Sequence, residues 1–224
     1  ELLGAVAYCA PLHLASTLPR VVPALTEVLA HPHPRVKEKA QESLSLVGSV
    51  IRNPEVGELV PVLLDALANP GTKTVAALDA LARCNFEHCV DPPSLALLVP
   101  IMLRGLRERG TQPRRRAAHI VGSMCSLLAD RRHIVPYLEA LLPPLRDVLL
   151  DPIPEVRTTA SRALGRLCAG LGEGHFPDLM PWLLTALRSE SSNAERAGAA
   201  QGLAELLAAL GERRLGEFLP ELLD

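Results

Sequence analysis

A short stretch with two cysteines and a histidine is the first place in this sequence where chemistry could be built. Cys84, His88 and Cys89 lie close together, and thiolates and imidazoles are the ligands that zinc prefers. Only three candidate ligands cluster here, however, and no pair has the Cys-x-x-Cys spacing of a structural zinc site. We therefore interpret the stretch as a loop between helices that carries a buried thiol, and we expect no metal.

Nucleotide binding and catalysis have equally weak signals. Residues 71–74, Gly-Thr-Lys-Thr, are superficially like a phosphate loop, but Ala66 stands where the first glycine is needed. His31 and His33 flank prolines in a turn, which favours a solvated or hydrogen-bonded role. No serine or cysteine has a recognisable histidine and acid arrangement. We expect no catalytic residue, no cofactor and no small-molecule substrate.

Arginine is the one charged residue type that is concentrated in one part of the sequence. Residues 104–132 contain eight arginines, although the net charge of the chain is only −2. Guanidinium groups bind phosphate bidentately, so exposed arginines can contact a nucleic-acid backbone. Two of the eight, Arg104 and Arg107, have the alternative role of solvating a helix face. The candidates for contact with nucleic-acid phosphates are Arg115, Arg116, Arg131 and Arg132.

The elements that carry these residues are predicted from residues 141–167. Apolar residues recur at helical spacing in both halves of this stretch. Between the halves, Pro152 disfavours helical geometry in the residue before it, and Pro154 fits the first turn of a new helix. A link this short makes the two helices antiparallel neighbours.

This helix pair is repeated along the chain. Prolines expected near the start of each first helix recur at intervals of 38, 39, 43, 38 and 39 residues, at Pro23, Pro61, Pro100, Pro143, Pro181 and Pro220. Such a period with two helices is typical of HEAT or armadillo solenoids. We predict an all-α, right-handed α-solenoid of HEAT repeats. Its five full repeats are 17–52, 53–90, 91–130, 133–172 and 175–211, with partial repeats at 1–16 and 212–224, and its helix pairs break near Pro32, Pro70, Gln112, Pro152 and Ser191.

A second pattern follows the same period. An acidic residue precedes an arginine by six positions in three repeats, at Glu108 and Arg114, Asp151 and Arg157, and Glu190 and Arg196. Repeat one has His31 and Lys37 there, and repeat two has Asn69 and Val75. The pattern resembles the ladder of HEAT repeats, in which an arginine opening each second helix meets an acidic turn in stacked neighbours. We expect Asp151 and Arg157 to order their turn and bridge repeats.

The amino-acid composition narrows the class of protein. The chain is 48% hydrophobic but only 3% aromatic, which suits closely stacked helices. Its apolar stretches are shorter than the roughly 18 residues of a membrane span, and no secretory segment opens it. We expect a soluble, cytoplasmic protein with five free, reduced thiols and no membrane contact. Both ends lack the polar face of a terminal repeat, so the sequence is interpreted as part of something longer.

Four segments carry a more specific resemblance. They are SVIRNPEV at 49–56, DPPSLALLVPIM at 91–102, DPIPEVRTTASRALG at 151–165 and RAGAAQGLAELLAALG at 196–211. Together they resemble the central HEAT region of the general control translational activators, which is itself similar to the HEAT domain of fungal elongation factor three. The resemblance implies ribosome association, detection of stalled ribosomes and stimulation of the initiation factor two alpha kinase during amino-acid starvation. In that family the kinase is bound by a segment further toward the C-terminus.

The function expected is that of a non-catalytic, ribosome-binding scaffold segment. Two alternatives stay open. One is the HEAT domain of an elongation-factor-three-like ATPase, which requires nucleotide cassettes elsewhere in the protein. The other is a transport or phosphatase scaffold, which the fold alone does not distinguish.

Overall fold

The chain folds into helices throughout the part that the structure describes. The structure is a computed structural model, and it describes residues 11–190, 192–211 and 216. Across these residues there are ten α-helices, two short 3-10 helices and no strand. The all-α prediction is therefore confirmed. None of the helices in the described ranges combines the length and the apolar character that crossing a membrane requires.

The helices alternate between the first and second members of each repeat. The first helices are α2 (Pro11–Val28), α4 (Pro54–Ala68), α6 (Pro92–Leu106), α8 (Leu138–Leu149) and α10 (Leu179–Leu187). The second helices are α3 (Pro34–Ser49), α5 (Pro70–Arg83), α7 (Thr111–Leu127), α9 (Pro154–Leu171) and α11 (Asn193–Leu210). The 3-10 helices η1 (Arg131–Tyr137) and η2 (Glu173–His175) precede α8 and α10.

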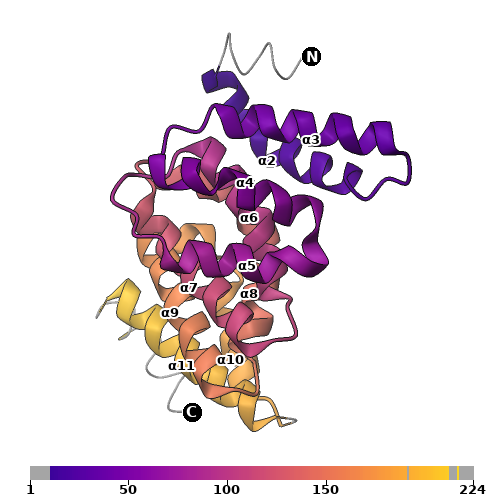
Figure 1. Cartoon of the computed structure of the whole chain (residues 1–224). Helices are drawn as coiled ribbons and strands as arrows, with labels where there is room; N and C mark the ends of the chain where they lie inside the picture. The colour runs from indigo at the N-terminus through magenta and orange to yellow at the C-terminus, as the bar shows by residue number, and fades with distance from the viewer. Residues whose placement is uncertain (1–10, 191, 212–215, 217–224) are drawn as a thin grey trace. The chain divides into compact units, whose positions relative to one another are not determined.

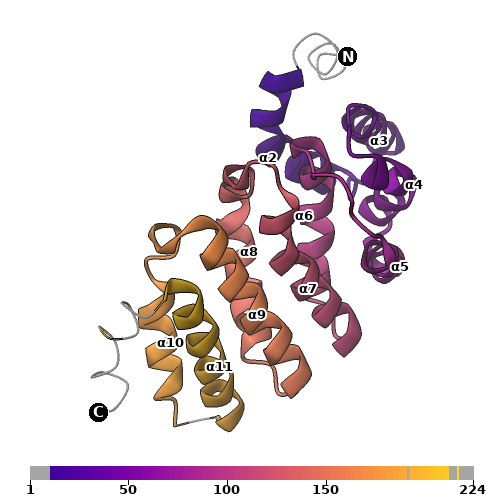
Figure 2. The ribbon, with the colours of Figure 1, turned by 90° about the vertical axis from the view of Figure 1, so that its left-hand side faces the viewer.

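The helices belong to two compact units. The first comprises Glu1–Gly105 and Leu127–Tyr137, and the second comprises Leu106–Ser126 and Leu138–Asp224. In the first unit α2 packs on α3, α3 on α4, and α4 on α5 (Figure 1). In the second unit α8 packs on α9, α9 on α11, and α10 on α11 (Figure 2). Successive helix pairs thus stack within each unit, as HEAT repeats do; the right-handed sense of a solenoid stays a prediction.

The helix pairs break close to the predicted positions. Proline occupies the first position of α3, α5 and α9, where its missing N–H costs no hydrogen bond. The break predicted at Pro152 falls in the turn between α8, which ends at Leu149, and α9, which begins at Pro154. The predicted break at Ser191, the partial repeat at 1–16 except its last residues, and Pro220 lie outside the described residues.

The expected place of the periodic prolines was wrong for most repeats. Pro23, Pro61, Pro100 and Pro143 lie inside α2, α4, α6 and α8, and only Pro181 lies in the first turn of its helix. Each interior proline removes one helical hydrogen bond and favours a bend, yet the helices continue through it. Tertiary packing of their apolar faces therefore overrides the local preference to stop.

Close packing in the second unit depends on small residues. A Cβ atom at Gly122 of α7 would lie 2.6 Å from the Ala163 Cα of α9, nearer than real side chains come. A Cβ at Gly165 of α9 would lie 2.9 Å from the Glu205 carbonyl oxygen of α11. These two glycines let three successive second helices approach backbone to backbone, which positions their outward side chains close together.

Candidate functional site

The ladder residues form one ion pair between repeats. In the second compact unit the Arg114 guanidinium at the start of α7 lies 2.7 Å from the Asp151 carboxylate in the turn before α9. The side chains are only 17% and 6% exposed. Arg114 also donates hydrogen bonds to the carbonyl oxygens of Glu108 (3.0 Å) and Arg109 (2.7 Å) in its own turn. One guanidinium thus ties its own turn to the turn of the following repeat.

Arg157 repeats half of this arrangement one repeat later. It is buried, and its Nη1 donates to the carbonyl oxygens of Asp151 (2.8 Å) and Pro152 (2.9 Å). The Asp151 carboxylate, in turn, accepts from the Ile153 N–H at 2.9 Å. Arg157 therefore binds the backbone carbonyl of Asp151, six positions earlier. The carboxylate of Asp151 pairs instead with Arg114 of the preceding repeat.

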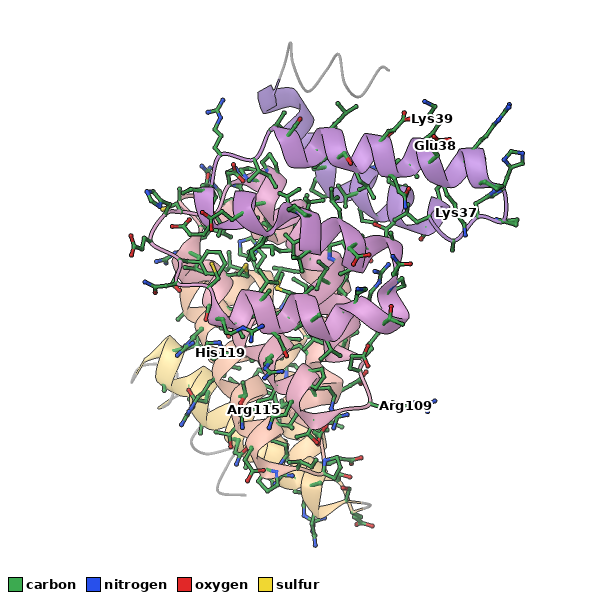
Figure 3. All side chains as sticks on the ribbon, in the orientation of Figure 1. Lys37, Glu38, Lys39, Arg109, Arg115 and His119 are labelled. Atoms are coloured by element: carbon green, nitrogen blue, oxygen red, sulfur yellow. The ribbon has the colours of Figure 1, made fainter. Side chains whose placement is uncertain are left out.

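The remaining ladder candidates lie in more open surroundings. Arg196 donates to the Ser189 carbonyl oxygen at 2.7 Å and to the Asn193 side-chain oxygen, so it also staples its own turn. Glu190 is exposed and Glu108 is half-buried. Lys37 is exposed on α3, beside Glu38 and Lys39 in the chain (Figure 3).

Repeat two has no arginine at this position, and a residue from the next repeat contacts its first helix instead. Val75 stands where the arginine would be and is 39% exposed. Arg104 of α6 reaches the end of α4 and donates to the carbonyl oxygens of Ala66 (3.1 Å) and Leu67 (3.4 Å). Burial lowers the pKa of the Arg104 guanidinium. Arg104 is thus a helix cap and not a solvating surface residue.

The four arginines predicted to contact phosphate fall into two pairs. Arg115 is exposed and Arg116 half-buried on α7, in the second compact unit, and Figure 3 labels Arg115. Arg131 and Arg132 are exposed in η1, in the first compact unit. Each pair is therefore a separate basic surface of its own unit.

Arg132 has a carboxylate beside it. Its guanidinium donates to both oxygens of Asp130, to Oδ2 at 2.7 Å and to Oδ1 at 3.0 Å, and Asp130 also accepts from the Arg132 backbone N–H. These hydrogen bonds hold the pKa of the Asp130 carboxyl at about 2. The positive charge of Arg132 is therefore partly offset by a neighbour that stays ionised at neutral pH.

The Cys84–Cys89 stretch is a loop held by hydrogen bonds. His88 Nδ1 lies 2.7 Å from the Glu55 carboxylate, which also accepts from the backbone N–H groups of Glu87 and His88. The His88 side chain holds the pKa of the Glu55 carboxyl at about 2, and Glu55 raises the pKa of His88. Among the described residues no three histidine, cysteine or acidic side chains could hold a metal ion.

Asn53 and Asp91 complete the attachment of this loop. The Asn53 side chain is buried, caps α4 by accepting from the Val56 N–H at 2.7 Å, and donates to the His88 and Cys89 carbonyl oxygens. Asp91 accepts from the backbone N–H groups of Arg52 (2.5 Å) and Ser94 (2.9 Å). The bonds from Asn53 to the loop and from Arg52 to Asp91 join residues 35 to 39 positions apart, so they depend on the folded arrangement of the helices.

The expectation of buried thiols was only partly right. Cys125 and Cys168 are buried, but Cys84 is half-buried and Cys89 is exposed. Cys89 faces solvent because the loop is fixed by its backbone carbonyl and by Asn53, and not by its side chain. Cys9 lies outside the described residues.

Sequence reasoning missed a basic groove in the second compact unit. A cavity of about 130 Å³ lies between α7 and α9 and is lined by His119, Gly122, Thr159, Arg162, Ala163 and Arg166. Arg115 precedes His119 by four residues on α7 (Figure 3). The residues that line the groove lie about 40 positions apart in the chain, near the repeat period, which is the one signal that could have joined them.

Comparison with known proteins identifies the repeat type. The family model described as elongation factor 3/GNC1 HEAT repeat matches residues 72–178. These residues include the second helices that carry the ladder arginines Arg114 and Arg157. Stacked antiparallel helix pairs, turn-stapling arginines and this match define the chain as a HEAT-repeat protein.

Similar proteins extend the match over the whole chain. The chain is 53% identical to Protein ILITYHIA of Arabidopsis thaliana over 229 aligned residues and 50% identical to the stalled ribosome sensor GCN1 of Homo sapiens over 222. It is 45% identical to the eIF-2-alpha kinase activator GCN1 of Saccharomyces cerevisiae over 223. These alignments cover 99% to 100% of this chain and 8% of each relative.

Elongation factor 3 is a more distant relative. That of Pneumocystis carinii is 31% identical over 185 residues, which cover 80% of this chain and 18% of that protein. The chain is therefore similar over its whole length to the GCN1 kinase activators, and it shares a HEAT-repeat region with elongation factor 3.

Proposed function

We propose that this chain is a ribosome-binding scaffold segment of a translational activator that stimulates the initiation factor two alpha kinase. It carries out no reaction itself and acts in the cytoplasm. Other parts of the same protein contact the kinase. The observation that carries the proposal is the identity of 45% to 53% over the whole chain with relatives that include a stalled ribosome sensor and a kinase activator.

The proposed contact with the ribosome is electrostatic. Arg115 and Arg116 on α7 and Arg131 and Arg132 on η1 supply cations in a chain whose net charge is −2. Phosphate contacts of this kind are independent of base sequence and position a protein on RNA. Arg115 and Arg116 would supply phosphate contacts from the second compact unit, and Arg131 and Arg132 from the first.

The HEAT domain of an elongation-factor-three-like ATPase is the second candidate. The similarity to elongation factor 3 supports it, but at 31% identity over 80% of the chain. The activators match at higher identity and over the full chain. The observations therefore favour the activator, and a transport or phosphatase scaffold has no support from the matching family.

Cosedimentation with purified ribosomes tests the contact. The chain is expected to sediment with ribosomes at low salt and to dissociate steeply as salt rises, because released counterions weaken phosphate contacts. A variant with Arg115, Arg116, Arg131 and Arg132 all changed to glutamate is expected to stay in the supernatant. Arg114 stays unchanged, because its loss would break the ion pair to Asp151.

Circular dichroism on the same samples shows whether the variant keeps its helices. A matched control carries glutamate at four exposed arginines elsewhere, at Arg20, Arg35, Arg83 and Arg107. The control has the same charge and is expected to lose less binding. A folded quadruple variant that sediments as well as the original chain would place the contact on another surface.

A further inference from the structure

We propose that the groove between α7 and α9 is a phosphate-binding site for a single RNA strand. The proposal deepens the proposed ribosome contact, because it moves the principal phosphate site to His119, Arg162 and Arg166, none of which belongs to the four arginines above. The cavity there, of about 130 Å³, has room for roughly four water molecules at ~30 Å³ each, and so for one tetrahedral oxyanion.

The backbone geometry of the two helices builds this groove. Because Gly122 lacks a Cβ, α7 and α9 approach so closely that an added Cβ would lie 2.6 Å from the Ala163 Cα. Side chains that flank this contact, His119 on α7 and Arg162 and Arg166 on α9, then line one small cavity from both sides. A groove formed by rigid helices holds its donors in place before the ligand arrives, which reduces the entropic cost of binding.

The charges around the groove are mostly uncompensated. Arg162 lies 3.7 Å from the Glu205 carboxylate of α11, a long and exposed pair that contributes little. Among the described residues, Arg115, His119 and Arg166 form no ion pair. These three side chains and that of Arg162 are all exposed at the surface of their helices. Three permanent positive charges and one histidine therefore gather with one carboxylate beside them.

The spacing of the charges fits a polyanion. Arg115 and His119 are four residues apart on α7, as Arg162 and Arg166 are on α9, and this spacing places each pair about 6 Å apart along its helix. Two rows with regular spacing suit a strand that carries a charge on every nucleotide. The groove is lined by no phenylalanine, tyrosine or tryptophan, so large stacking platforms for bases are absent and the contact is expected to be mainly to phosphates.

The test measures binding of a fluorescent oligouridylate of about 16 nucleotides to the 224-residue chain across a salt series. The variant Arg162→Glu with Arg166→Glu is expected to weaken binding at least tenfold. It should also reduce the slope of the logarithm of the binding constant against the logarithm of salt concentration by about 1.4, because each lost phosphate contact with a single strand contributes about 0.7. The control, Arg20→Glu with Arg35→Glu, has the same charge change on exposed residues of the other compact unit and is expected to change affinity less than twofold.

A third variant separates a built site from general positive charge. Thr159→Leu keeps every charge but fills the groove, and it is expected to weaken RNA binding as well. If Thr159→Leu and Arg162→Glu with Arg166→Glu both bind RNA like the original chain, the groove is not the site. Preference for polyglutamate over the oligouridylate would overturn the proposal in favour of an acidic protein partner.

Ribosome cosedimentation of the same variants distinguishes failure of the groove site from failure of the proposed ribosome contact. If the groove variants lose RNA but the chain still sediments through Arg115, Arg116, Arg131 and Arg132, the groove site stands and the ribosome contact does not depend on it. If the chain sediments with ribosomes but binds no RNA, the phosphate site is overturned while the proposed function remains.

Discussion

At the scale of single residues, buried arginines in the turns hold this chain together. Arg157 is 8% exposed and donates to two backbone carbonyl oxygens of its turn, whereas Arg166 is exposed further along the same helix. Removing a buried donor leaves its acceptors unsatisfied, and each such loss is more costly than an exposed hydrogen bond.

Arg157→Ala is therefore expected to destabilise the chain by about 1 to 3 kcal/mol, and Arg166→Ala by much less. For a chain of this size each kcal/mol corresponds to roughly 2 to 4 °C in melting temperature. Thermal denaturation followed by circular dichroism measures both variants. Equal melting temperatures would contradict a turn-stapling role for Arg157.

The ion pair of Arg114 and Asp151 gives a prediction of its own. Both side chains are largely buried, so removing either partner leaves the other uncompensated, at a cost of about 3 to 5 kcal/mol. The double variant Arg114→Ala with Asp151→Ala is expected to lose less unfolding free energy than the two single variants lose together, with a difference of about 0.5 to 3 kcal/mol. A double-mutant cycle from urea denaturation measures this coupling. Additive losses would mean that the two side chains do not interact in solution.

At the scale of elements, glycines mark where helices touch. Gly57 in α4 has open space around the position of a Cβ, whereas Gly122 in α7 faces the Ala163 backbone at 2.6 Å. Gly57→Ala is expected to raise stability by about 0.5 to 1 kcal/mol, through helix propensity. Gly122→Ala is expected to lower it by about 1 to 3 kcal/mol, because the helices must separate. Melting temperatures of the two variants check the opposite signs, and a stabilising Gly122→Ala would contradict the close approach.

The loop at residues 84–91 responds to pH through the pair of Glu55 and His88. The raised pKa of His88 contributes stability that is complete below pH 6.5 and is lost as pH rises through the folded pKa. The lowered pKa of Glu55 contributes stability above pH 4.5 that is lost as pH falls toward about 2. The pair is therefore most stabilising between pH 4.5 and 6.5.

His88→Ala is expected to flatten the fall in melting temperature as pH rises above 6.5, because a histidine with a raised pKa no longer loses its proton there. His175→Ala, which removes an exposed histidine in η2, serves as the matched control and should leave that fall unchanged. Glu55→Gln should bring the pKa of His88 down, as nuclear magnetic resonance titration would show. An unshifted pKa in Glu55→Gln would mean that the pair does not form.

The elements also show what the sequence could and could not predict. The helix pairs and their breaks follow from local signals, namely apolar periodicity and prolines such as Pro152 and Pro154. Contacts between residues far apart in the chain do not. Arg104 of α6 caps α4 of the preceding repeat, and Asn53 binds a loop 35 residues further along the chain. The groove of His119 and Arg166 likewise exists only when two second helices stack, so it follows from packing between repeats and not from local sequence signals.

At the scale of the whole molecule, this chain spans 8% of the length of its GCN1 relatives. Repeats contact mainly their neighbours, so a segment can keep its local surfaces while its effect depends on the rest of the protein. Ribosome binding by the segment and stimulation of the kinase by the complete protein are therefore separate steps of the proposed function, and they need separate measurements.

Replacing the matching segment of the Saccharomyces cerevisiae relative with this chain tests whether the segment supports stimulation of the kinase. The readout is phosphorylation of initiation factor two alpha in amino-acid-starved yeast, with deletion of the segment as the baseline. We expect this chain to restore phosphorylation. At equal protein levels, the variant with glutamate at Arg115, Arg116, Arg131 and Arg132 is expected to restore less of it. Full phosphorylation with the quadruple variant would contradict the claim that this segment acts through its arginines on the ribosome.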